Sequence, residues 1–216
     1  MGTYAGAMTL TDMVLTDRVE DLLAGPVPLP IVAAGDPVLR RRAEPYDWSL
    51  PPDLFTALIG AMRATMRAAP GVGLAAPQVG LGIQLAVLED PAAVPADTAA
   101  VRGRSPLPFR VLVNPSYRPV DDTVAAFYEG CLSVPGYQAV VERAGAVRLT
   151  AFNETGAALN EIVTGWAARI VAHESDHLAG VLYLDKALSR SLTDNENYSR
   201  RWAAPTPQQA RVELGF

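Results

Sequence analysis

The segment His173-Glu174-Ser175-Asp176-His177 constrains the fold more than any other part of the sequence, because it holds both histidines of the 216-residue chain. Residues four positions apart lie on the same face of a helix, so the two imidazoles can reach one metal ion. Glu174 would then lie beside the water that such an ion holds, as in metal-dependent hydrolases with a His-Glu-x-x-His pattern. An amphipathic helix that carries two histidines for other reasons is the alternative interpretation.

The spacing of the two histidines favours the metal-binding interpretation. Two randomly placed histidines would fall four residues apart about once in a hundred sequences, before any glutamate is required. We therefore expect a helix from about Thr164, a suitable N-cap residue, to Ala179, with Gly180 at its end.

A third metal ligand in this chain cannot be a histidine. Position 183, where a metalloprotease with a longer three-histidine motif would carry its third histidine, is Tyr183, so an acidic residue or Cys131 must serve. A lone cysteine is most often a small buried hydrophobic residue. However, Gly130 allows close approach of the backbone, and polar residues flank Cys131 on both sides within Glu129–Ser133. A thiolate with two imidazoles is a known three-ligand catalytic set that leaves a fourth position for water.

The segment Gly71-Val72-Gly73-Leu74-Ala75-Ala76-Pro77-Gln78 is a second candidate for the site. It could simply end a helix and form a flexible turn. It lacks the Lys and the Ser or Thr of a phosphate-binding loop. Its glycines and small residues suit the close approach of an extended substrate, and Gln78 offers an amide donor for an oxyanion.

Hydrophobic periodicity predicts an α+β domain, with helices on both sides of a group of strands. The pattern predicts helices over residues 11–24, 52–69 and 164–179, and short strands over residues 83–88, 111–113 and 147–151. Asn153 to Gly156 supplies a turn before a further strand. Residues 90–108 contain four prolines and little periodicity, and we interpret them as a tolerated insertion rather than a lid. The segment after Asp185 is polar and is expected to be peripheral.

The length of 216 residues fits one ordinary domain with some extra length, or two very small domains. The net charge of -5 weighs against nucleic-acid binding, which needs a basic surface. The single cysteine excludes an internal disulfide and favours a reducing compartment. Because neither a targeting signal nor a membrane-spanning apolar run is evident, we expect a soluble cytoplasmic protein.

The three segments GVGLAAPQ, EGCLS and HESDH, in this order and at these separations, resemble the signature motifs of peptide deformylases. Residues from about Ile31 to Asp185 fit the layout of that family, including the stretch Gly35-Asp36-Pro37-Val38-Leu39-Arg40. The resemblance implies small antiparallel or mixed sheets packed around a central helix that bears the His-Glu-x-x-His motif. It also implies one catalytic domain over residues 1–216, with a core over residues 31–185, an N-terminal helical extension over 1–30 and a C-terminal tail over 186–216.

The resemblance also implies a role for each matched residue. Cys131, His173 and His177 would hold one divalent metal ion, with ferrous iron in the cell and zinc, nickel or cobalt possible in purified protein. Glu174 would be the general base and acid. Polarisation of the formyl oxygen is assigned to Gln78 and the backbone N–H of Leu132, and substrate binding to Gly73, Glu129 and Gly130.

The substrate implied by the resemblance is a formyl-methionyl peptide, encountered as nascent chains at the ribosome. Positions three, four and seven before His173 share its helix face, which predicts that Ile170, Arg169 and Trp166 border the pocket for the methionine side chain. In similar proteins the position of Arg143 approaches this helix, so we also expect a buried ion pair between Arg143 and Asp176.

Three other functions stay open from the sequence. Ala172 stands where such proteins usually carry Gln, which leaves room for a member without deformylase activity. An endopeptidase could use Glu196, downstream of His177, as its third ligand. A structural zinc site is a further alternative, although such sites prefer four protein ligands.

Overall fold

The structure, a computed structural model, describes residues 10–216 and has an α+β architecture with two antiparallel sheets. The larger sheet has five strands in the order β1-β2-β3-β6-β7, and the smaller has three in the order β4-β5-β8. The strands are β1 (Gly73–Ala75), β2 (Leu85–Asp90), β3 (Leu107–Pro119), β4 (Val124–Cys131), β5 (Val134–Ala144), β6 (Ala146–Phe152), β7 (Ala158–Thr164) and β8 (Thr193–Asp194).

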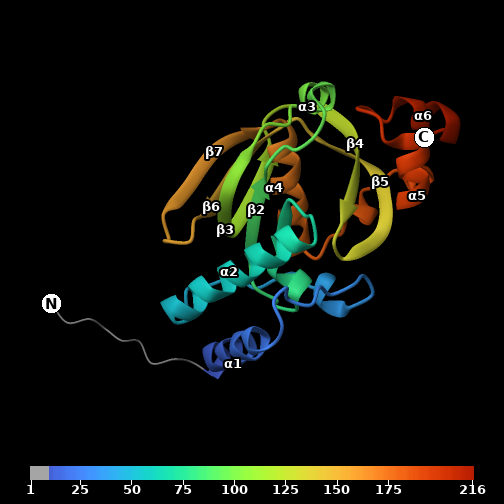
Figure 1. Ribbon diagram of the computed structural model, residues 1–216. Coiled ribbons are helices and arrows are strands. Elements are labelled where there is room, and N and C mark those ends of the chain that lie inside the picture. The colour runs from blue at the N-terminus through green and yellow to red at the C-terminus, as the bar shows by residue number, and fades with distance from the viewer. Residues whose placement is uncertain (1–9) are drawn as a thin grey trace.

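One helix, α4, contacts strands of both sheets and lies between them (Figure 1). The helices are α1 (Leu10–Ala24), α2 (Pro52–Ala68), α3 (Ala96–Arg102), α4 (Gly165–Leu178), α5 (Asn195–Asn197) and α6 (Gln208–Leu214). Short helical turns are η1 (Pro37–Leu39), η2 (Ala76–Val79), η3 (Tyr183–Asp185), η4 (Ser189–Ser191) and η5 (Tyr198–Trp202). None of the helices within residues 10–216 combines the length and the apolar character needed to cross a membrane.

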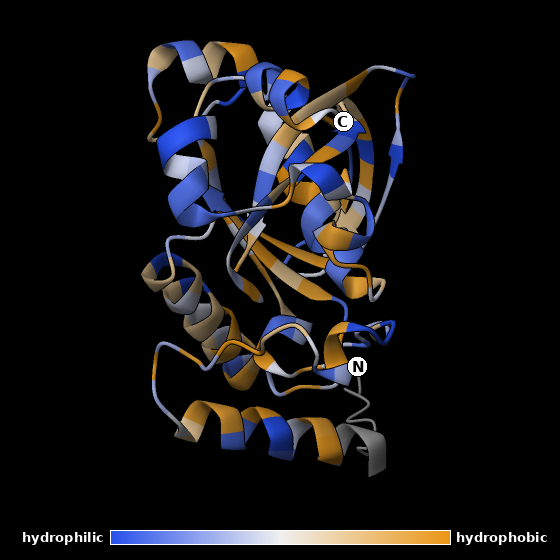
Figure 2. Ribbon diagram, turned by 90° about the vertical axis from the view of Figure 1, so that its right-hand side faces the viewer, coloured by the Kyte–Doolittle hydropathy of each residue, from blue (hydrophilic) through white to orange (hydrophobic). Residues whose placement is uncertain are grey.

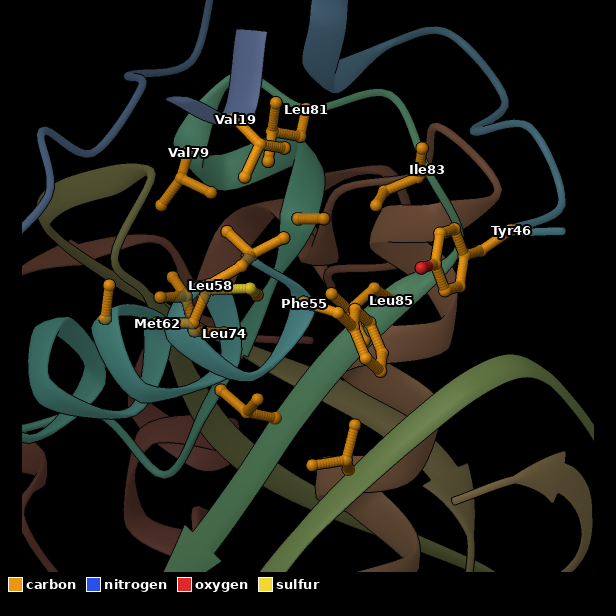
Figure 3. Close-up of a cluster of buried hydrophobic side chains, with 14 of the residues drawn as sticks. Val19, Tyr46, Phe55, Leu58, Met62, Leu74, Val79, Leu81, Ile83 and Leu85 are labelled. Atoms are coloured by element: carbon orange, nitrogen blue, oxygen red, sulfur yellow. The ribbon is translucent and has the colours of Figure 1, made fainter. Parts of the chain in front are cut away.

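The amphipathic helix predicted over residues 52–69 is confirmed as α2. Its buried face includes Phe55, Leu58, Met62 and Met66, which pack against Leu74, Leu85 and other strand residues of the largest core cluster (Figure 3). The methionines are therefore core residues. The β6–β7 hairpin and its turn at residues 153–156 also follow the predicted pattern, because Val147, Leu149 and Ala151 are the buried residues of β6.

The N-terminal extension packs onto the domain through α1. Val19 of α1 is fully buried in the largest core cluster, the one around α2 (the α2 cluster). The backbone N–H of Leu29 donates to Oγ1 of Thr65 in α2. Hydrophobic and hydrophilic residues alternate along the coloured part of α1, the helix at the bottom of Figure 2. Its apolar residues Leu15, Val19, Leu22 and Leu23 pack on the core, whereas Asp17, Glu20 and Asp21 are exposed, so one side of this helix contributes to the core.

Residues 90–108 contain regular secondary structure and contact other parts of the domain, unlike a surface loop without partners. They include the last residue of β2, all of α3 and the start of β3. Arg104 holds the buried carboxylate of Asp90 with two hydrogen bonds of 2.7 and 2.9 Å. Arg102 donates to the backbone oxygens of Ala204 and Pro205 in the C-terminal tail. Because these partners are distant in sequence, local periodicity gives no sign of them.

The C-terminal tail is not peripheral, contrary to the sequence-based expectation. Its segments lie along the outer side of β5 (Figure 1). Trp202 and Ala210 of the tail are buried against Tyr128 of β4 and Val140 of β5. The tail thus covers the hydrophobic face of the small sheet, which would otherwise be open to water.

The first stability prediction concerns Glu89 of β2, which accepts four hydrogen bonds from Arg63 and Arg67 of α2 at 2.7 to 3.1 Å. These bonds lower the pKa of Glu89 to about 2. Since the folded pKa lies below the unfolded value, the carboxylate stabilises the protein above about pH 4.5, and this contribution disappears as pH falls toward 2. We expect Glu89→Gln to cost about 1 kcal/mol at pH 7 and little at pH 2.5.

Thermal unfolding of both proteins across this pH range checks the prediction. Glu154→Gln, at an exposed position, is the matched control and should leave Tm unchanged throughout. A Tm difference for Glu89→Gln that stays constant from pH 7 to pH 2.5 would show that the carboxylate charge is not its cause.

Candidate metal centre and active site

Helix α4 carries six of the predicted site residues, among them both histidines and Glu174, and is fixed at its first turn by backbone contacts. Thr164 occupies the N-cap position, as predicted, but its side chain makes no capping hydrogen bond. Instead, the backbone N–H of Gly165 donates to Gly145, and that of Trp166 donates to Gly103. At the other end, Gly180 adopts a left-handed conformation with φ of 77°, as expected for a residue that ends a helix.

Cys131, at the end of β4, joins His173 and His177 of α4 in one cluster. One potential ligand atom from each residue lies within 4.8 Å of the other two, and Sγ of Cys131 is 3.2 Å from Nε2 of His177. The ring centroids of the two histidines are 5.1 Å apart. This spacing and this donor set fit a divalent metal bound by one thiolate and two imidazoles. Burial lowers the pKa of His177 well below its usual value, which favours the neutral imidazole that binds metals.

Glu129 orients the first histidine of this cluster. Its Oε2 lies 3.0 Å from Nδ1 of His173, so Nε2 is the ring nitrogen of His173 that is available to a metal. Its Oε1 accepts hydrogen bonds of 2.7 Å from Arg143 and 2.6 Å from Arg169. Burial alone would raise the pKa of Glu129, but hydrogen bonds from His173 and Arg143 hold it well below its usual value.

The sequence reasoning assigned Glu129 to substrate binding and missed its contact with His173. Both of its carboxylate oxygens are occupied within the protein, and the residue is only 6% exposed. The side chain therefore serves the histidine and two arginines, and any contact with substrate would fall to its backbone.

The predicted ion pair between Arg143 and Asp176 is confirmed. Nη1 of Arg143 donates to Oδ2 of Asp176 at 2.7 Å, and the two side chains are 4% and 7% exposed. Asp176 also accepts hydrogen bonds from Lys186 and Tyr117. Burial alone would lower the pKa of Arg143, but its bonds with Glu129 and Asp176 raise it above its usual value. The buried charges of Arg143 and Asp176 are therefore each paired with an opposite charge.

Glu174 lies beside the cluster as a buried carboxyl group with one oxygen left without a hydrogen bond. It is 4% exposed, and its Oε2 has no hydrogen-bond partner among the residues that the structure describes. Burial raises the pKa of Glu174 to about 7, against the opposing charges of His173 and Arg143. A buried carboxyl group with a raised pKa beside a candidate metal site is typical of a general base.

Gln78 is held with its amide nitrogen toward the cluster. Its Oε1 accepts from the backbone N–H of Ala75 at 2.9 Å, which directs Nε2 toward Sγ of Cys131 at 3.6 Å and Oγ of Ser133 at 3.3 Å. The amide nitrogen of Gln78 therefore lies next to Cys131, and its predicted role as an oxyanion donor stays a prediction. Ser133 is fully buried and was not among the predicted site residues, although it belongs to the same short segment as Cys131.

The other predicted site residues occupy different surroundings. Leu132 follows Cys131 and packs on the α2 cluster, while Gly130 pairs with Gln138 of β5. Gly73 lies in β1 beside Glu174. Leu132 and Gly130 are thus the chain neighbours of Cys131, and Gly73 lies next to Glu174.

The three residues predicted to border the methionine pocket have extensive contacts within the protein. Ile170 is 4% exposed and belongs to a hydrophobic core cluster. The guanidinium of Arg169 bonds Glu129 and the backbone oxygen of Val141, so its head group, and not only its stem, is buried. Trp166 packs between Phe127 and several arginine side chains. Their contact with a substrate stays a prediction.

The interpretations as an endopeptidase and as a family member without activity both lose their structural basis. Glu196 is 81% exposed and lies beside Arg200, whereas Cys131 joins the histidines, so Glu196 is not the third ligand. Ala172 is buried, and Glu129 contacts His173 directly. Orientation of this histidine therefore does not depend on a polar side chain at position 172.

Comparison with known proteins agrees with this site. The family model described as Polypeptide deformylase matches residues 28–192. Peptide deformylase 3 of Streptomyces avermitilis is 64% identical over 202 residues, which cover 94% of this chain and 90% of that protein. The Met-Ala-Ser-bound class I type b peptide deformylase of Acinetobacter baumannii is 33% identical with a TM-score of 0.65, covering 73% of this chain and 97% of that one.

A third relative is the peptide deformylase of Synechococcus elongatus in complex with actinonin, which is 34% identical with a TM-score of 0.65 and covers 77% of this chain and 84% of that one. The family match spans all three sequence motifs and every residue of the Cys-His-His cluster. The chain therefore belongs to the polypeptide deformylase family, hydrolases that remove the formyl group from the N-terminal methionine of polypeptides.

Proposed function

We propose that Cys131, His173 and His177 hold one divalent metal ion, and that Glu174 is the catalytic base beside it. The observation that carries this proposal is the buried Glu174 carboxyl group, whose Oε2 has no hydrogen-bond partner among the described residues, beside one cysteine and two histidines whose ligand atoms lie within 4.8 Å of one another. When bound, the metal supplies Lewis-acid chemistry and a water of lowered pKa. We propose ferrous iron as the metal in the cell, with zinc, nickel or cobalt able to use the same donors.

The side chains of the site then perform the proton transfers and stabilise charge. Glu174 takes a proton from the attacking water and delivers it to the amine nitrogen as the bond between that nitrogen and the formyl carbon breaks. The amide of Gln78 and the backbone N–H of Leu132 donate to the formyl oxygen as it gains negative charge. Formate and a free amino terminus are the products.

The substrate that we propose is a nascent polypeptide with an N-terminal formyl-methionine, met in the cytoplasm as it leaves the ribosome. The Met-Ala-Ser tripeptide bound to the Acinetobacter baumannii relative supports a peptide that begins with methionine. Gly73, Glu129 and Gly130 would bind its backbone, and Trp166, Arg169 and Ile170 would border its methionine side chain. The whole chain would form one catalytic domain, with residues 31–185 as its core.

The role of Glu174 predicts different outcomes for two substitutions. Glu174→Gln keeps the size of the side chain and removes the base, so the variant should retain metal while kcat falls by about 10²- to 10⁴-fold. His173→Ala removes a ligand and should lose metal and activity together. Metal analysis and formate release by each purified variant check both outcomes.

Each contrary result has a defined meaning. Near-normal formate release by metal-loaded Glu174→Gln would exclude Glu174 as the base. Loss of metal from Glu174→Gln to the extent seen in His173→Ala would instead make Glu174 a ligand.

The buried network predicts a large stability loss when Arg143 is replaced. Arg143→Met leaves the carboxylates of Glu129 and Asp176 buried without their shared partner, which should cost about 3 to 5 kcal/mol. Lys186→Met is the matched control. Because Lys186 is 38% exposed, its replacement removes only a partly exposed contact of Asp176. Its cost should be about 1 kcal/mol or less.

Urea unfolding of both variants at one saturating zinc concentration measures the difference. Equal losses for Arg143→Met and Lys186→Met would show that Arg143 does not compensate the two buried carboxylates.

A further inference from the structure

We infer that Gly73 is a positioning residue for Glu174, because the absence of a side chain at position 73 leaves the space that the Glu174 carboxylate occupies. This inference rests on the proposed role of Glu174 as the base. It assigns Gly73 a function besides the backbone contact with substrate that the sequence motif implies.

The distances at this position exclude any side chain while Glu174 stays in place. A Cβ atom on Gly73 would lie 2.2 Å from Oε1 of Glu174, 2.5 Å from its Cδ and 2.7 Å from its Cγ. All three distances are shorter than real contacts of a Cβ atom. Because three successive atoms clash, a small rotation of the carboxylate does not relieve the conflict, and the side chain has to leave its position.

The backbone of Gly73 does not itself require glycine. The residue lies in β1, paired with Leu88 of β2, and it is not among the glycines with positive φ. An L-residue could therefore adopt this conformation. The requirement for glycine comes from the neighbouring helix, whose Glu174 occupies the place of a side chain.

Two other glycines show that this requirement is specific. At Gly71, in the same motif, an added Cβ would lie below 3.0 Å from one atom only, Cδ1 of Leu132 at 2.9 Å, at the end of a flexible side chain. At Gly60 of α2, an added Cβ would meet no atom within 4 Å. Gly73 is the glycine of the motif that is placed against the base.

The steric role and the substrate-binding role make different kinetic predictions. Alanine at position 73 retains the backbone N–H and C=O, so a role limited to backbone hydrogen bonds predicts little change or a change mainly in KM. Displacement of the base predicts a fall in kcat with metal content intact. The two roles can therefore be separated with one substitution.

The experiment compares Gly73→Ala with Gly60→Ala in zinc-loaded protein, measuring metal content, kcat and KM for a formyl-methionyl peptide. We expect Gly73→Ala to retain zinc and lose at least about 100-fold in kcat, with KM changed only a few-fold. Gly60→Ala should behave as the unsubstituted protein. A normal kcat for Gly73→Ala, or a rise in KM as its only effect, would overturn the inference.

A double-mutant cycle tests the steric contact without reference to catalysis. Glu174→Ala removes all three clashing atoms, so Gly73→Ala should lower Tm clearly in the unsubstituted background and much less in the Glu174→Ala background. Equal decreases in both backgrounds would overturn the inference. This result holds even if Gly73→Ala folds too poorly for kinetics.

The cycle also separates this inference from the proposed function. If Glu174→Gln keeps near-normal activity, Glu174 is not the base, and the positioning role falls with it whatever the cycle gives. If Glu174→Gln is inactive and metal-loaded but the cycle shows no coupling, the proposed function stands and only the role of Gly73 is rejected.

Discussion

The contact between Glu129 and His173 is the interaction on which the organisation of this domain depends. Glu129 lies on β4, Arg143 on β5, and Arg169 and His173 on α4, and one buried carboxylate contacts all three of these partners. The contact joins the small sheet to the central helix and sets the orientation of an imidazole of the candidate metal site at the same time. Because Cys131 is two residues beyond Glu129 on the same strand, the position of its sulfur follows from the same contact. The candidate metal site is therefore assembled by the packing of a strand against a helix.

Such a network requires that every charge be matched, because the desolvation of each ion costs several kcal/mol. Arg143 lies between Glu129 and Asp176, and Lys186 completes the set at the protein surface. Glu174 is the exception, since its Oε2 lacks a partner and its pKa is raised by burial. Among the residues that the structure describes, the buried carboxyl group left without a full set of partners is thus the one that we propose as the catalytic base.

The sequence predicted the parts of this arrangement that depend on local spacing. The helix bearing His173 and His177, the amphipathic face of α2 and the alternation in β6 all follow from periodicity within a few residues. The resemblance of the motifs to a family added the ion pair of Arg143 with Asp176. The sequence could not show that Glu129 serves His173, because its partners are 14 to 44 residues away. The same reason applies to the contact between α3 and the tail. Arg102 of α3 bonds Ala204 and Pro205, which are about a hundred residues away in the sequence.

The small residues around the site follow from how closely α4 approaches the larger sheet. Glu174 of α4 lies against β1, and a protein interior has no volume to spare at native packing density. Gly73 provides the space on the strand side, because a Cβ atom there would lie 2.2 Å from Oε1 of Glu174. Ala75 of β1 and Ala168 of α4 are small buried residues of one core cluster. In the same motif, the backbone N–H of Ala75 holds Gln78. The motif GVGLAAPQ thus combines two structural tasks, since Gly73 makes room for Glu174, the proposed base, and Ala75 orients Gln78, the proposed oxyanion donor.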